Sequence, residues 1–264
     1  MEIAEHIDAL RREGDLLADA AVRAGLAAAV PPCPSWLVKD LLRHTGYVHR
    51  WAARHIAECP DQVIAGSSEA EILGGGVADA DLLAWFRDGH AALAQTLATA
   101  DPAVECATFM PAPSPLAFWA RRQAHETAIH RADADSAAGA TAEYPPEFAA
   151  DGIDELITGF GRRRKYQPGA DGGGLLRVVA ADTGDAWSVE PREGRLHPVR
   201  DTADTADTAP PAAAPATACT VTGPASGVYL YLWNRADAPR AGVTVTGDPA
   251  LLAAWQASVR VRWD

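Results

Sequence analysis

The stretch RRQAHETAIHRADAD, residues 121–135, places histidine, glutamate, arginine and aspartate side chains within a few helical turns of one another. Ser114 and Pro115 precede it, and a serine followed by a proline is a common helix start, with serine as the N-cap and proline in the first turn. We therefore predict a helix over residues 116–139. Such polar density is typical of an exposed helix face, but also of a metal site or an acid–base site.

Further helices on both sides of this one are predicted by the spacing of apolar residues and by the Pro and Gly breaks between them. They span residues 3–29, 36–57, 81–100 and 145–164. Ser35 is the expected N-cap of the second of these helices. Four or five helices of this length with short connections favour an up-down bundle.

The pattern changes after about residue 165, where short β-type runs replace the long helices. Strands are predicted at residues 175–182, 186–191, 219–223 and 241–248, and helices at residues 225–236 and 249–261. The repeated DTA and the Pro/Ala tract at residues 201–217 indicate a low-complexity loop. The predicted fold class is therefore α+β. It comprises a four-helix bundle over residues 1–168, a boundary between 165 and 174, and a small α+β domain over residues 174–264.

The overall composition is that of a globular protein with an acidic surface. The net charge of −12 and the pI near 5.0 argue against binding to nucleic acid or to an anionic membrane, because both need a basic face. No apolar run reaches the roughly 20 residues that span a bilayer, and the acidic N-terminus is unlike a signal peptide. We therefore expect a cytoplasmic monomer whose four scattered cysteines are free thiols.

One stripe of the helix predicted around RRQAHETAIHRADAD collects polar side chains, since a helix turns by about 100° per residue. The stripe consists of Arg122, Glu126, His130 and Asp133. Glu126 and His130 stand four residues apart, so their side chains emerge side by side and can hold one metal ion. His125 lies on another side of the helix. Two ligands from one helix are too few for a metal site, so a third must come from another helix.

The helix predicted over residues 36–57 offers the missing ligand in His44, which lies on the apolar face of that helix and points into the bundle. The candidate metal ligands are therefore His44, Glu126 and His130. Two histidines and a carboxylate around an open position suit a catalytic Zn²⁺ ion. Asp133 and Arg122 are placed to orient these ligands. The alternatives at this point are a hydrogen-bonded core histidine and an ordinary helix ion pair.

Two segments of the sequence together resemble the mycothiol-dependent maleylpyruvate isomerase family. They are SWLVKDLLRHTGYVHRWA at residues 35–52 and FWARRQAHETAIHRADAD at residues 118–135. That family belongs to the DinB-like superfamily of four-helix-bundle metalloproteins. Residues 219–255 resemble the C-terminal domain of the same family, so the resemblance covers most of the chain.

The resemblance implies one divalent metal, usually zinc, held by a histidine of the second helix and by a glutamate and a histidine of the long fourth helix. These positions match His44, Glu126 and His130. The resemblance also implies mycothiol as cosubstrate and an actinobacterial source, which the Ala- and Arg-rich composition suits. Ala132 stands where tryptophan is common in the family, and this departure leaves the identity of the substrate open.

The function implied by the resemblance is that of a zinc-dependent thiol enzyme, either an isomerase or an S-transferase. The cation holds the thiol of mycothiol as a thiolate, which attacks a small electrophile such as maleylpyruvate. Arg122 is the candidate for binding a substrate carboxylate, with an ion pair to Glu126 or Asp133 as the alternative. Arg235 is a candidate for contacting the cofactor. Two other classes stay open, a DinB-like metal-dependent hydrolase and a non-catalytic bundle that binds a metal or a small ligand.

Overall fold

The computed structural model describes residues 1–64, 76–162, 174–193, 195–201 and 217–259. Contacts between the described residues divide the chain into two compact units, Met1–Ala142 and Glu143–Asp264. No helix within the described ranges is both long and apolar enough to cross a membrane.

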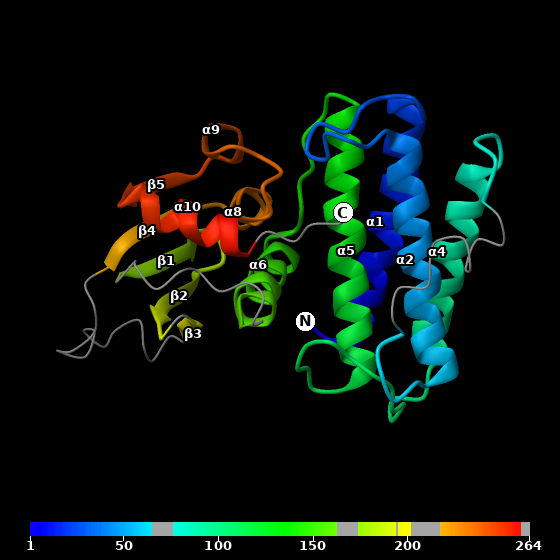
Figure 1. Ribbon diagram of the computed structural model, residues 1–264, viewed down its shortest axis with the longest axis horizontal. Helices are drawn as coiled ribbons and strands as arrows, with labels where there is room; N and C mark the ends of the chain where they lie inside the picture. Colours follow the sequence, from blue (N-terminus) through cyan, green and yellow to red (C-terminus); the bar gives the residue numbers. More distant parts are fainter. Residues whose placement is uncertain (65–75, 163–173, 194, 202–216, 260–264) are drawn as a thin grey trace. The chain divides into compact units, whose positions relative to one another are not determined.

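The described part of the first unit is a bundle of four long helices, which confirms the predicted fold class (Figure 1). They are α1 (Ile3–Ala24), α2 (Val38–Glu58), α4 (Leu82–Thr99) and α5 (Pro115–Ala137). α1 packs against α5 and α4, and α2 packs against α4 and α5. α1, α2 and α4 each bury an apolar stripe against their neighbours, whereas α5 is buried on most sides and carries polar as well as apolar side chains into the bundle. Leucine, isoleucine and phenylalanine side chains fill much of the core.

Two helix starts show how local sequence sets the boundaries in this unit. α5 begins as predicted, because Ser114 Oγ accepts a hydrogen bond from the backbone N–H of Ala117 at 3.1 Å. The prediction of Ser35 as the N-cap of α2 is wrong, since the N-cap is Leu37. The carboxylate of Asp40 accepts a hydrogen bond from Leu37 N at 2.9 Å and so supplies the cap from within the helix. Residues 30–37 consequently form a loop that precedes α2.

α4 approaches α1 and α2 so closely that glycine is required at the contacts. A Cβ atom on Gly14 would lie 2.2 Å from His90 Nε2, and one on Gly46 would lie 2.2 Å from the Trp85 ring. The guanidinium carbon of Arg50 lies 3.8 Å from the centroid of that same ring. These contacts fix α2 against α4, while His44 and His49 of the same helix reach residues of α5.

The second unit is a small α+β domain whose described residues form a five-stranded sheet (Figure 1). Its strands are β1 (Leu175–Ala180), β2 (Asp185–Arg192), β3 (Arg195–Asp201), β4 (Thr217–Gly223) and β5 (Thr244–Gly247). The strand order is β3-β2-β1-β4-β5, with β1 and β4 parallel and the other neighbours antiparallel. The helices α8 (Ala225–Leu232) and α9 (Ala238–Ala241) follow β4, and α10 (Pro249–Ser258) follows β5.

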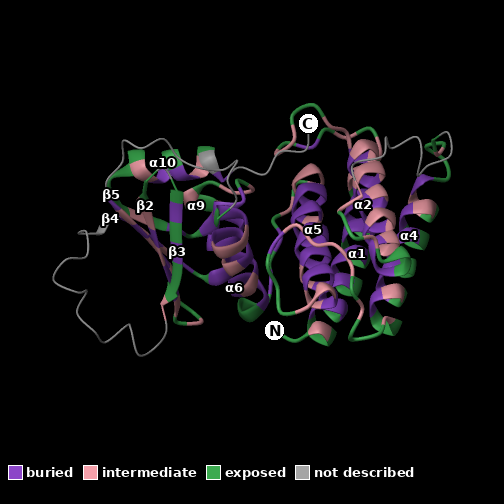
Figure 2. Cartoon of the chain, turned by 60° about the horizontal axis from the view of Figure 1, so that its bottom comes forward, coloured by how far each residue is buried: buried purple, intermediate pink, exposed green. Residues whose placement is uncertain are grey.

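β3 is an edge strand that the sequence analysis did not predict. Buried and exposed residues alternate along it, with Leu196 and Pro198 buried between exposed neighbours (Figure 2). Most of its outward positions carry arginine or histidine, and its proline interrupts the β-type pattern. Polar and proline-bearing strands are common at sheet edges, where they discourage pairing with another chain.

The helix predicted over residues 145–164 belongs to the second unit. It is divided into α6 (Pro146–Asp154), a π-helical turn (Glu155–Gly159) and a 3₁₀ turn (Phe160–Arg162). α6 packs against α8, and Trp187 Nε1 donates a hydrogen bond to Asp154 Oδ1 at 2.9 Å. For this reason the contacts divide the chain after Ala142. This division comes earlier than the boundary predicted between residues 165 and 174, which separated domains over 1–168 and 174–264. Most of the predicted boundary region, and most of the low-complexity loop, lie outside the described residues.

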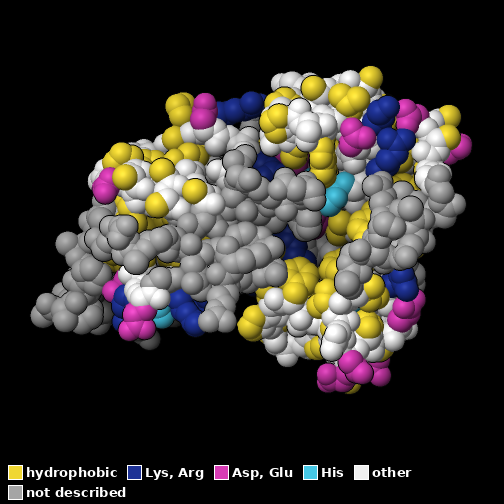
Figure 3. All heavy atoms as spheres, in the orientation of Figure 1, with side chains coloured by type: hydrophobic (Ala, Val, Ile, Leu, Met, Phe, Trp, Pro, Cys, Tyr) yellow, Lys and Arg dark blue, Asp and Glu magenta, His cyan; other side chains and the backbone are white. Residues whose placement is uncertain are grey.

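The described part of the surface in Figure 3 shows lysine and arginine side chains in small groups beside aspartate and glutamate. Surface ion pairs of this kind include Arg54 with Glu58, whose Nε and Oε1 atoms are 3.0 Å apart. On this face the charges are therefore mixed, as expected for an acidic chain without a basic stripe.

Candidate metal centre

α2 and α5 bring the three candidate ligands His44, Glu126 and His130 together. One ligand atom from each residue lies within 4.8 Å of the other two. Glu126 Oε1 is 3.5 Å from His44 Nε2 and 3.2 Å from His130 Nε2. Glu126 and His130 are buried, whereas His44 is half-buried and is the ligand nearest to solvent. The three residues that helix periodicity indicated therefore have their donor atoms close together inside the bundle.

The Oε1 atom of Glu126 has the surroundings that a cation needs. It is buried, and among the described residues no donor meets it with the geometry of a hydrogen bond. A buried carboxylate oxygen without such a bond is costly, unless a positive charge lies beside it. The nearest polar neighbours are two imidazole nitrogens, which offer lone pairs when the rings are neutral. The three donors therefore fit a divalent cation, and two histidines with one carboxylate are a donor set of catalytic zinc sites.

The charges around the cluster favour an ionised glutamate. Burial on its own would raise the pKa of Glu126, but the imidazoles of His130 and His44 and the guanidinium of Arg122 hold it well below its usual range. Burial would likewise lower the pKa of His130, but the carboxylates of Asp133 and Glu126 raise it on balance. In the absence of a cation, a proton on the His130 imidazole is therefore favoured by the negative charge that a metal ion would otherwise balance.

Asp133 fixes the orientation of the His130 ring. Its Oδ2 atom lies 2.9 Å from His130 Nδ1 and accepts the proton on that nitrogen, which leaves Nε2 as the atom that faces Glu126. Cys33 Sγ, from the loop before α2, lies 3.9 Å from the same Oδ2 atom. The orienting role expected of Asp133 thus has a direct geometric basis.

Replacing Asp133 with asparagine should weaken metal binding by about 10-fold, the lower end of the range for loss of such an orienting carboxylate. The amide keeps the shape and can still accept from Nδ1, but it lacks the negative charge that makes the imidazole a stronger ligand. Competition with a chromophoric chelator measures the affinity. Asp135→Asn is the matched control, because Asp135 pairs with Arg131 and Arg23 instead of the cluster. Equal affinities for both variants would contradict the orienting role.

The two arginines singled out by sequence analysis have different surroundings. Arg122 is buried, and its Nη2 atom donates to Glu126 Oε2 at 3.2 Å. This contact favours the ion-pair alternative over direct binding of a substrate carboxylate. Arg235 lies in the second unit, where its Nη1 atom donates to Trp233 O at 2.8 Å. A role for Arg235 in cofactor binding stays a prediction.

Sequence analysis missed Trp36, whose indole lies beside both histidine ligands. The ring centroids are 4.9 Å apart for Trp36 and His44, and 6.1 Å apart for Trp36 and His130. The tryptophan was assigned to a helix, and no helical periodicity applies to it because it belongs to the preceding loop. Only the fold of that loop places it beside the cluster.

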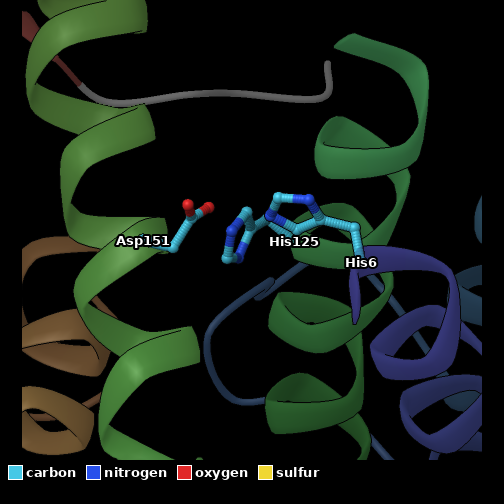
Figure 4. Close-up of side chains that lie close together, drawn as sticks. All are labelled: His6, His125 and Asp151. Atoms are coloured by element: carbon cyan, nitrogen blue, oxygen red, sulfur yellow. The ribbon is translucent and has the colours of Figure 1, made fainter. Parts of the chain in front are cut away.

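His125 faces α1 and not the candidate metal centre, as the separation on the helix predicts. Its ring meets that of His6 edge to face, with centroids 6.1 Å apart (Figure 4). Both rings are buried. His6 therefore has a ring partner that sequence analysis did not identify, because the two residues come from the first and the last helix of the bundle.

A further buried histidine, His49, gives the bundle a pH dependence. Its Nε2 atom lies 2.8 Å from Thr127 Oγ1, and the Thr127 hydroxyl donates to Gln123 O at 2.7 Å, so His49 is the donor to Thr127. Burial, with a smaller contribution from the neighbouring His90, lowers the pKa of His49 well below its usual value. The pKa of His90 is also lowered by burial. The imidazoles of His49 and His90 therefore stay neutral in the folded chain at pH values where the same side chains are protonated in the unfolded chain.

We expect the metal-free protein to lose stability as the pH falls below about 6.5, the pKa of histidine in an unfolded chain. The unfolded state binds protons there that the folded state excludes, at up to about 1.4 kcal/mol per pH unit for each such histidine. The contribution of His130 to stability has the opposite pH dependence, because its pKa is raised in the folded chain. That contribution is complete below the pKa of the unfolded state and is lost as the pH rises from there through the pKa of the folded state. Thermal unfolding in chelator measures the slope, and His49→Gln should reduce it. A slope that His49→Gln leaves unchanged would exclude this histidine as a source.

Comparisons with known proteins cover both units. Residues 7–135 match the protein family described as "Mycothiol maleylpyruvate isomerase N-terminal domain". Residues 147–254 match the family described as "MDMPI C-terminal domain". The two matched segments flank the division at Ala142 between the compact units.

Two solved structures are similar to the chain over almost its full length. They are the crystal structures of the mycothiol-dependent maleylpyruvate isomerase and of a histidine-to-alanine variant of it, with TM-scores of 0.63 and 0.62. Each is 16% identical in sequence and covers 94% of this chain and 95% of its own. At this identity the likeness concerns the fold. No curated protein matches the sequence.

Proposed function

The chain belongs to the mycothiol-dependent maleylpyruvate isomerase family, and from this premise we propose that it is a metal-dependent thiol enzyme. Its metal ligands are His44, Glu126 and His130, zinc is the preferred ion, and mycothiol is the cosubstrate. The observation that carries the proposal is the convergence of three metal-ligating atoms inside the bundle, where the buried Glu126 Oε1 lies 3.5 Å from His44 Nε2 and 3.2 Å from His130 Nε2.

The charge balance of the ligands suits a thiolate. Glu126 supplies one negative charge and two neutral imidazoles supply none, so a divalent cation bound there keeps a positive charge that lowers the pKa of a thiol. Arg122 adds a further positive charge next to Glu126 Oε2. Asp133 holds the Nδ1 proton of His130 and so keeps the Nε2 lone pair directed at the centre.

The proposed reaction is addition of the thiolate sulfur to a carbon–carbon double bond conjugated with a carbonyl group. A carbon–sulfur bond forms, and the π electrons move onto the carbonyl oxygen, which leaves a single bond that rotates. Return of the electrons expels the thiolate and restores the double bond in the trans form. An electrophile with a leaving group instead releases that group and keeps the sulfur, which is S-transfer.

Thiol-dependent turnover by the metal-loaded protein tests this function. The protein is stripped with chelator, reloaded with zinc, and assayed with maleylpyruvate in the presence and absence of mycothiol. We expect isomerisation only when zinc and mycothiol are both present. Consumption of mycothiol with other electrophiles, but no isomerisation, would assign the protein to S-transfer. Turnover that is independent of any thiol would overturn the proposal in favour of metal-dependent hydrolysis.

A further inference from the structure

Trp36, His44 and His130 form a cluster of three mutually adjacent rings. The His44 and His130 centroids are 5.0 Å apart with their planes at 75°, so the two ligand rings meet edge to face. The Trp36 indole lies nearly parallel to His130, at 26°, and is tilted by 50° to His44. One apolar side chain therefore contacts both imidazoles whose Nε2 atoms face Glu126.

The loop that carries Trp36 is held in place by its own hydrogen bonds. Trp36 N donates to Cys33 O at 2.8 Å, and Val30 N donates to Trp36 O at 3.0 Å. A β-bridge between Ala29 and Leu37 closes the loop at its base. Both backbone polar groups of Trp36 are thus used within the loop, and the indole is carried on a fixed support.

Cys33 anchors the same loop to α5. Its Sγ atom lies 3.9 Å from Asp133 Oδ2, the atom that accepts from His130 Nδ1. The loop therefore contacts His130 in two ways, through Asp133 at Nδ1 and through Trp36 on the ring. Trp36 itself is half-buried.

We propose that Trp36 is a positioning residue of this centre, which holds the planes of both histidine ligands and forms the apolar wall against which the thiol sulfur binds. The inference rests on the proposed function, and it adds a physical reason why the centre would bind a thiol sulfur in preference to a water molecule. Sulfur makes favourable contacts with aromatic rings, whereas water makes only weak hydrogen bonds to an indole face. An apolar wall also excludes solvent, which strengthens the attraction between a cation and a thiolate.

Cobalt substitution tests this role without relying on turnover. Co²⁺ replaces zinc in the wild type and in the variants Trp36→Phe and Trp36→Leu, and mycothiol is titrated while the sulfur-to-cobalt charge-transfer band is recorded. Phenylalanine keeps an aromatic face, and leucine keeps an apolar side chain without one. Trp85→Phe is the control, because Trp85 is another half-buried tryptophan of the bundle but stacks on Arg50. Circular dichroism establishes that each variant is folded.

We expect Trp36→Leu to retain cobalt, to show an altered visible cobalt spectrum, and to raise the Kd for mycothiol at least about fivefold, as loss of a sulfur–aromatic contact predicts. Trp36→Phe should restore most of the affinity, and Trp85→Phe should match the wild type. A Trp36→Leu variant with the spectrum and Kd of the wild type would overturn the inference and leave the proposed function intact. Failure of the wild type to bind cobalt, or to give the thiol band, would overturn both.

Discussion

Replacing His130 with alanine is expected to abolish stable metal binding while the helical fold is retained. The substitution removes one of three donor atoms and also removes one partner of the buried Asp133 carboxylate. Loss of a ligand should cost more than the about 10–100-fold in affinity that follows the loss of an orienting partner. Elemental analysis of the dialysed protein gives the stoichiometry, and circular dichroism reports the helix content.

His125→Ala is the matched control for this experiment. His125 lies on the same helix and is equally buried, but its ring contacts His6 and not the cluster. It should keep the metal content of the wild type. Equal metal content in the two variants would remove His130 from the centre, and metal lost from both would point to a general disturbance of α5.

Gly227→Ala is expected to give the largest loss of stability in the second unit. A Cβ atom at this position of α8 would lie 1.9 Å from the carbonyl oxygen of Ala241 in α9. A backbone atom held by its own helical turn cannot move aside as a flexible side chain can. We expect the free energy of unfolding to fall by about 3 kcal/mol, the upper end of the cost of overpacking.

Gly161→Ala is the control for this prediction, because it adds the same methyl group where there is room. The nearest atoms to a Cβ at Gly161 are Leu156 O at 3.6 Å and Leu196 Cδ1 at 3.9 Å, both ordinary contact distances. Denaturant unfolding followed by tryptophan fluorescence measures both variants, since Trp187 is buried in this unit. Similar midpoints for the two variants would show that α8 and α9 do not pack as closely as described.

The parts of this protein that were predictable from sequence are those governed by local periodicity. The bundle follows from apolar spacing along each helix, and the pairing of Glu126 with His130 follows from their separation by one turn. His44 could be added because it lies on the apolar face of its own helix. In each case the side-chain direction is determined by the residue's own helix, so no knowledge of the tertiary structure was needed.

Features that depend on contacts between distant segments were not predictable in this way. Trp36 reaches the cluster because a loop folds back on itself, and β3 is a strand because β2 offers it a partner. The helix after Pro145 has the pattern of a bundle helix, yet it packs on α8, whose apolar face it covers. Periodicity shows that a face will be buried but does not show against which element.

X-ray absorption at the zinc edge of the reloaded protein, before and after addition of mycothiol, tests the central claim most directly. Without thiol, the account predicts nitrogen and oxygen neighbours only, with an imidazole signature from His44 and His130. With thiol, it predicts one additional sulfur neighbour at about 2.3 Å, the usual zinc–sulfur distance. A spectrum that stays free of sulfur at saturating mycothiol, or one without imidazole neighbours, would contradict the assignment of this cluster as a thiol-activating metal centre.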